Sequence, residues 1–122
     1  MKLFTHNILV CNSKSCKINN YPLRIIPIKM DNITTDYNDE LIKRFIRKVD
    51  FNGLKQGIAD MGIKTKYDFS LLQEEDLLKD DVLGELHHVL FENVLVDGVL
   101  QCSNCGLKYP VNNGIADFVI NE

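Results

Sequence analysis

The chain contains 122 residues, of which 45% are hydrophobic, and carries a formal net charge of −3 at pH 7. This length fits one domain or two small lobes, and the apolar fraction is sufficient for a hydrophobic core. The acidic balance and the scattered basic residues disfavour direct, strong binding to DNA or RNA through phosphate neutralisation. No apolar run approaches the length that crosses a bilayer, and the N-terminus makes a poor signal peptide, so we expect no membrane partner.

The first part of the sequence predicts extended chain around a pair of cysteines. Residues 2–10 are expected to be extended, and Cys11 and Cys16 enclose a polar C-x4-C turn. Residues 21–30 are rich in β-branched side chains but contain two prolines. Because proline lacks an N–H donor, this run predicts an edge strand or two short strands. The polar residues 31–39 predict a loop.

The middle of the chain predicts three helices. Residues 40–49 place apolar side chains on one helical face and basic side chains on the other, with Asn38 or Asp39 as the expected N-cap. A second helix is expected over residues 52–61, where a following glycine provides the stop. The stretch 70–92 begins with a capping-box sequence, SLLQ, and predicts one long helix.

The C-terminal part predicts strands around a second pair of cysteines. Residues 93–101 are expected to form a hairpin about an Asp-Gly step that leads into Cys102. Cys102 and Cys105 are separated by two residues and followed by glycine, which is typical of a zinc knuckle. Two apolar runs, 107–111 and 115–120, flank an Asn-Asn-Gly turn. An Asn-Gly step between apolar runs is a strong indication of a hairpin.

The order of these elements predicts the α+β class. We expect a zinc-ribbon-like β lobe built from both chain ends, residues 1–30 plus 93–122, with residues 31–92 inserted as a three-helix lobe. The simplest assembly brings the two chain ends together around one metal ion. The expected ligands are the four cysteines of the two turns: Cys11, Cys16, Cys102 and Cys105.

Four thiolates complete the tetrahedral coordination that zinc adopts in structural sites. Such a site leaves no position open for water or substrate, so we expect one structural zinc ion rather than a hydrolytic centre. Two disulfides are the first alternative, which the poor signal peptide disfavours. An iron ion held by four thiolates, as in rubredoxin, is the second alternative.

No motif in the sequence indicates an active site. It lacks a nucleophile elbow, a P-loop and a glycine-rich dinucleotide turn. His87 and His88 are adjacent on a predicted helix, where their side chains diverge by about 100° and cannot bind one ion together. We therefore expect a non-catalytic protein. The apolar run 115–120 predicts either a core strand or an edge that pairs with another protein's sheet.

Several segments together resemble a known family: MKLFTHNILVC at the start, the C-x4-C turn, LHHVLFE at 86–92 and GVLQCSNCGLKYPVNNGIADFVI at 98–120. They resemble the small zinc-binding activator subunit that eukaryotic and archaeal S-adenosylmethionine-dependent methyltransferases share. The resemblance covers nearly the whole chain. It implies a non-catalytic heterodimer partner of enzymes that methylate tRNA, rRNA and a glutamine of the peptide-release factor. It also implies zinc on the four cysteines and a cytoplasmic and nuclear location.

The resemblance further implies a surface for the enzyme. In this family the zinc lobe extends the enzyme's sheet through strand pairing and covers an apolar patch on it. The implied contact residues lie near the N-terminus and in the last strand: Leu3, Thr5, Asn7, Ile8, Gly114, Ile115, Ala116, Asp117, Phe118 and Val119. The competing hypothesis is a rubredoxin-like electron carrier, in which the metal itself is the functional group.

Overall fold

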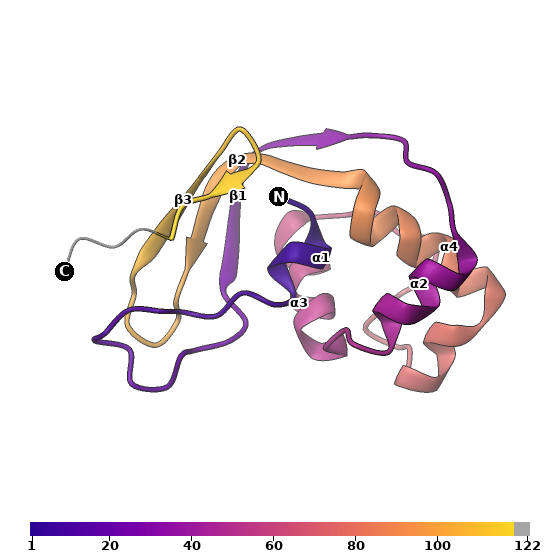
Figure 1. Cartoon of the computed structure of the whole chain (residues 1–122), viewed down its shortest axis with the longest axis horizontal. Helices are drawn as coiled ribbons and strands as arrows, with labels where there is room; N and C mark the ends of the chain where they lie inside the picture. The colour runs from indigo at the N-terminus through magenta and orange to yellow at the C-terminus, as the bar shows by residue number, and fades with distance from the viewer. Residues whose placement is uncertain (119–122) are drawn as a thin grey trace.

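The computed structural model describes residues 1–118 of the chain. Within this part, an antiparallel sheet occupies one side of the molecule and helices occupy the other (Figure 1). This confirms the predicted α+β class. The four strands follow one another in the order of the sequence: β1 (Arg24–Asn32), β2 (Asn93–Gln101), β3 (Lys108–Asn112) and β4 (Ile115–Ala116).

Two strands that lie far apart in the sequence, β1 and β2, pair with each other in the sheet. β1 pairs with β2 from Arg24 opposite Gln101 to Asn32 opposite Asn93, with an irregularity after Pro27. β1 lies at the end of the strand order, which confirms the edge strand predicted for residues 21–30. Proline is tolerated in an edge strand because its nitrogen can lie on the outer side, where no N–H donor is needed for the hydrogen bonds to the neighbouring strand.

β2 is one long strand, so the hairpin predicted over residues 93–101 is wrong. The strand continues through Asp97 and Gly98, and Gly98 lies opposite Pro27 of β1 and Val111 of β3. A Cβ atom at Gly98 would stand 2.7 Å from the carbonyl oxygen of Ile26. The glycine therefore allows two backbones to approach closely and does not make a turn.

The N-terminal segment contains a short helix, α1 (Leu3–His6), where the sequence predicts extended chain. Only the beginning of the segment, before α1, is extended and pairs with a strand. There the backbones of Met1 and Leu95 exchange hydrogen bonds of 2.6 Å and 2.8 Å. Leu3 and His6 are 1% and 0% exposed. Both side chains lie on the face of α1 that packs against other helices, and this tertiary contact explains the helix.

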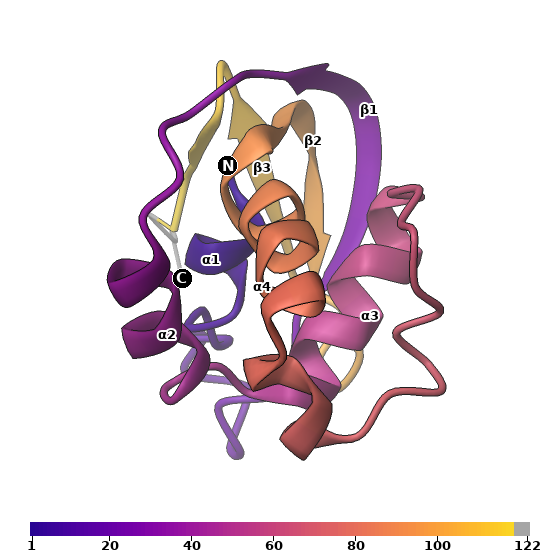
Figure 2. The ribbon, with the colours of Figure 1, turned by 90° about the vertical axis from the view of Figure 1, so that its right-hand side faces the viewer.

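Two of the predicted helices form, although the first ends three residues earlier than predicted. α2 (Asp39–Ile46) begins where the Asn38 side chain accepts a hydrogen bond from the Leu41 N–H, which confirms one of the two predicted N-caps. α3 (Phe51–Met61) ends at Gly62, whose φ of 64° is left-handed. Figure 2 shows α3 alongside β1.

The long helix predicted over residues 70–92 is broken into three pieces. They are a 3-10 helix η1 (Glu74–Leu78), α4 (Asp80–His87) and a π-helical turn η2 (His88–Glu92). Lys79 is extended and separates the first two. The capping contact lies three residues later than predicted, because the Asp76 carboxylate accepts the Gln73 N–H at 3.0 Å.

The sheet and the helices share one hydrophobic core. Its fully buried members include Leu100 of β2 and Leu86 of α4, and both are 0% exposed. α1 packs against α3 and η2, although the predicted division of the chain assigns residues 1–30 to the β lobe. The division into two lobes remains a prediction.

Candidate metal centre and partner surface

The four cysteines predicted as ligands lie together at the end of the sheet where β2 leads into Cys102. Their sulfur atoms all lie within 4.8 Å of one another, and no other group of metal-ligating side chains occurs among residues 1–118. The Cys11–Cys105 and Cys16–Cys102 sulfur pairs are both 3.7 Å apart. A tetrahedron with zinc–sulfur bonds of about 2.3 Å has sulfur atoms about 3.8 Å apart. The cluster can therefore hold one metal ion.

The second knuckle is built by local backbone hydrogen bonds. The Gly106 N–H donates to the Cys102 carbonyl at 2.9 Å, and Gly106 has a φ of 79°. The Cys105 N–H donates to the Cys102 sulfur at 3.4 Å. N–H groups directed at a sulfur stabilise the thiolate form, which is the form that binds metal.

The two knuckles also contact each other through a residue that the sequence analysis missed. The side-chain amide of Asn104 donates to the Cys16 sulfur at 3.4 Å. This amide, followed by a backbone hydrogen bond from Asn20, lowers the pKa of Cys16 to about 6. The position of an amide side chain inside the C-x-x-C turn was the available indication. The loops that carry the two knuckles lie side by side at the lower left of Figure 1.

The predicted partner residues divide into a buried and an exposed set. Leu3 is 1% exposed and Asn7 is 6% exposed. The Asn7 amide exchanges hydrogen bonds of 2.9 Å with the backbone of Asp50. Asn7 therefore holds the end of α1 against the start of α3, Leu3 packs beside Gly57 of the same helix, and both side chains are buried.

The other predicted partner residues are accessible to different degrees. Ile8 is 69% exposed and Ile115 is 72% exposed. Thr5 and Asp117 are exposed, whereas Gly114, Ala116 and Phe118 are half-buried, and Val119 lies outside the described residues.

The two edges of the sheet differ in how they are covered. At the β1 edge, the Ile25 N–H donates to the Asp60 carboxylate of α3 at 3.0 Å, and Pro27 has no N–H. β4 is the last strand in the order, so its outer edge has no neighbouring strand within residues 1–118. An uncovered edge is a template for pairing with another chain. Among residues 1–118, no strand obstructs the β4 edge, so this edge can receive such pairing.

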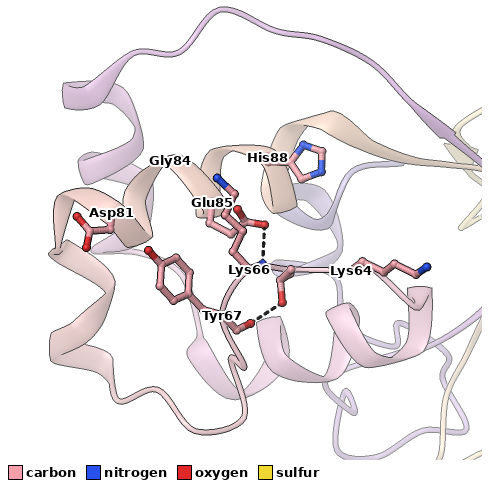
Figure 3. A pocket seen from close by; sticks show the side chains of 8 residues that line it. Lys64, Lys66, Tyr67, Asp81, Gly84, Glu85 and His88 are labelled. Carbon is pink, nitrogen blue, oxygen red and sulfur yellow. Dashed lines mark hydrogen bonds between the residues drawn. The ribbon is translucent and has the colours of Figure 1, made fainter.

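A hollow lies among the helices, away from the cysteines. It measures about 740 Å³ and lies between α4 and the loop that follows α3 (Figure 3). Its internal contacts join Glu85 to the backbone N–H of Lys66 and Thr65 to the carbonyl of Tyr67. These bonds hold the loop in place and do not pair a general acid with a base.

The adjacent histidines also have structural partners. His87 Nε2 lies 2.8 Å from the Thr35 hydroxyl, and His88 Nδ1 lies 3.1 Å from a Glu92 carboxylate oxygen. The His87 Nε2 also lies 3.8 Å from the other carboxylate oxygen of Glu92, so both rings approach this side chain. No helix in the described part of the chain is long and apolar enough to cross a membrane.

Comparisons with known proteins give one consistent result. A model of the Trm112p-like protein family matches residues 2–114. The chain is 35% identical over 128 residues to multifunctional methyltransferase subunit TRM112 homolog A of Arabidopsis thaliana, covering 100% of this chain and 98% of the relative. It is 30% identical over 132 residues to multifunctional methyltransferase subunit TRM112 of Saccharomyces cerevisiae, covering 98% and 96%.

A solved structure has the same fold. It is a chain of the E. cuniculi Mtq2–Trm112 complex, which methylates the translation termination factor eRF1. The TM-score is 0.65 at 22% sequence identity, over 98% of this chain and 95% of that one. The family match over nearly the whole described chain, together with these relatives, shows that the protein belongs to the Trm112p-like family.

Proposed function

We propose that this protein is a non-catalytic subunit that binds and stabilises S-adenosylmethionine-dependent methyltransferases in the cytoplasm and nucleus. Its relatives are named multifunctional methyltransferase subunits, and a chain of similar fold forms a complex with Mtq2. These names support the activator role over the rubredoxin-like electron carrier. By the same resemblance, the substrates of its partner enzymes are tRNA, rRNA and the peptide-release factor.

The proposed cofactor is one structural zinc ion on the four cysteines. The observation that supports it is the spacing of the sulfur atoms, which are 3.7 Å apart in two pairs drawn from opposite chain ends. Four protein ligands fill a tetrahedral site, so the ion supplies folding energy and no reaction centre. Metal analysis distinguishes the alternatives, because a zinc protein is colourless and an iron tetrathiolate is red.

The single observation that carries the proposed partner role is the apolar, uncovered β4 edge. Ile115 of β4 is 72% exposed, and β4 has no strand on its outer side within the described residues. Strand addition at such an edge satisfies the backbone groups of both chains, and alternate side chains provide specificity. Ile8, which is 69% exposed, belongs to the same proposed surface.

The test compares two isoleucines with similar exposure at opposite edges of the sheet. Ile115 is 72% exposed at the β4 edge and Ile28 is 75% exposed on β1. We expect Ile115→Asp to abolish co-purification with a methyltransferase, because a charge would be buried in the contact. Ile28→Asp should leave co-purification unchanged.

Both variants should remain folded, because neither side chain lies in the core. Equal melting temperatures and equal metal content would verify this. If Ile115→Asp still co-purifies with the enzyme at the wild-type level, or if Ile28→Asp alone loses it, the β4 edge is not the contact surface.

A further inference from the structure

A tyrosine hydroxyl lies in contact with one of the four cysteine sulfurs. Tyr109 is on β3 and is 1% exposed. Its hydroxyl donates to the side-chain oxygen of Asn12 at 2.9 Å, and the hydroxyl oxygen lies 3.2 Å from the Cys11 sulfur. The Asn12 backbone N–H donates to the same hydroxyl oxygen at 3.1 Å. The tyrosine of the C-terminal half therefore contacts the first knuckle of the N-terminal half.

The hydrogen-bond capacity of these groups determines where the hydroxyl proton can go. A tyrosine hydroxyl has one proton to donate, and the Asn12 N–H already occupies a lone pair of its oxygen. Two acceptors then compete for the proton: the Asn12 side-chain oxygen and the Cys11 sulfur. A thiolate that binds metal has no proton of its own, so Cys11 can only accept in that state.

We propose that Tyr109 is a positioning residue of the metal centre, whose hydroxyl proton shifts from the Asn12 oxygen toward the Cys11 thiolate when metal binds, because a charged acceptor forms the stronger hydrogen bond. This inference rests on the proposed metal site. Hydrogen bonds to a ligand fix its orientation and tune its charge, and their loss typically weakens metal binding about 10- to 100-fold. Tyr109 has a further geometric effect, since it ties Cys11 to the strand that follows the Cys102–Cys105 knuckle.

The location of Tyr109 also relates the metal centre to the proposed partner surface. The Phe118 ring packs on the Tyr109 ring with a centroid distance of 4.3 Å and an interplanar angle of 31°. Phe118 is half-buried and lies just beyond β4. The residue that contacts the Cys11 sulfur is thus covered by the segment that we expect to meet the enzyme.

The experiment uses Tyr109→Phe and Asn12→Ala in the full chain. Tyr109→Phe keeps the buried ring and removes the donor. Asn12→Ala changes an exposed side chain and removes the competing side-chain oxygen. Of the two acceptors, the Cys11 sulfur then remains. The readouts are the rate of zinc transfer to a chelator and the thiolate-to-metal charge-transfer band of the cobalt(II)-substituted protein.

We expect Tyr109→Phe to release zinc about 10-fold faster and to move the charge-transfer band to longer wavelength, because the thiolate regains electron density. Asn12→Ala should move the band to shorter wavelength. A tyrosine that only packs would leave the band unchanged in both variants, and that result would overturn the inference. A wild-type protein that binds neither zinc nor cobalt would instead overturn the proposed metal site.

Discussion

Replacing Gly57 with alanine tests the contact between α1 and α3 that the sequence did not predict. A Cβ atom at Gly57 would stand 2.5 Å from Leu3 Cδ2 and 3.3 Å from His6 Nδ1. Both of these side chains belong to α1 and are fully buried. The added methyl group must therefore displace the Leu3 side chain within the core between α1 and α3.

The expected magnitude follows from two opposing effects. Alanine is about 1 kcal/mol more favourable than glycine in a helix interior. Extra atoms in a closely packed core cost about 1–3 kcal/mol. The net result for Gly57→Ala is a loss of stability of about 1 kcal/mol. Gly84 of α4 provides the matched control, since no atom lies within 4 Å of an added Cβ there. Gly84→Ala should therefore gain about 1 kcal/mol.

The assay is urea unfolding of both variants at equal zinc content. The two free energies of unfolding should move in opposite directions and differ by about 2 kcal/mol. A stabilisation of Gly57→Ala equal to that of Gly84→Ala would refute the reasoning. It would mean that α1 does not pack on this glycine, and the extended N-terminus predicted from the sequence would become tenable again.

Further predictions concern the metal and a buried histidine. Cys102→Ser and Cys105→Ser should each release zinc and lower the melting temperature, and a variant with full metal content and an unchanged melting temperature would exclude that ligand. Burial lowers the pKa of His6, with the Leu23 carbonyl partly opposing this. Folding then favours the neutral ring. The contribution of His6 to the stability of the fold is therefore complete above the ordinary histidine pKa of about 6.5 and is lost as the pH falls through the lower pKa of the folded state. An NMR titration should show this, and a His6 pKa at or above 6.5 would contradict it.

The sequence predicted the features that neighbouring residues determine. The cysteine pairs form knuckles because each turn is short and internally hydrogen-bonded. The caps at Asn38 and Gly62 occur where predicted, because an N-cap side chain bonds only three residues ahead and a left-handed residue ends a helix by itself. For the same reason, the Asn113-Gly114 turn joins β3 and β4 as expected, with φ values of 51° and 80°.

The features that the sequence missed depend on distant residues. The Asp97-Gly98 step resembles a hairpin turn, yet it continues as a strand because β1 and β3 pair with it on both sides. α1 forms because Leu3 reaches a glycine on α3. Tyr109 contacts Cys11, which lies 98 positions earlier in the sequence. No local pattern contains these contacts, so periodicity and capping rules could not find them.

The unequal sheet edges bear on how many enzyme molecules one subunit can bind. Asp60 and Pro27 obstruct strand addition at the β1 edge, so Ile28 is exposed on a strand that cannot readily receive a partner. Within the part of the chain that the structure describes, β4 has no strand on its outer edge and carries the exposed Ile115. An antiparallel sheet with one usable edge can be extended by one strand only. We therefore expect a 1:1 complex, and methyltransferases that use this edge should displace one another in a competition pull-down. A complex that holds two different catalytic chains on one subunit would require a second surface.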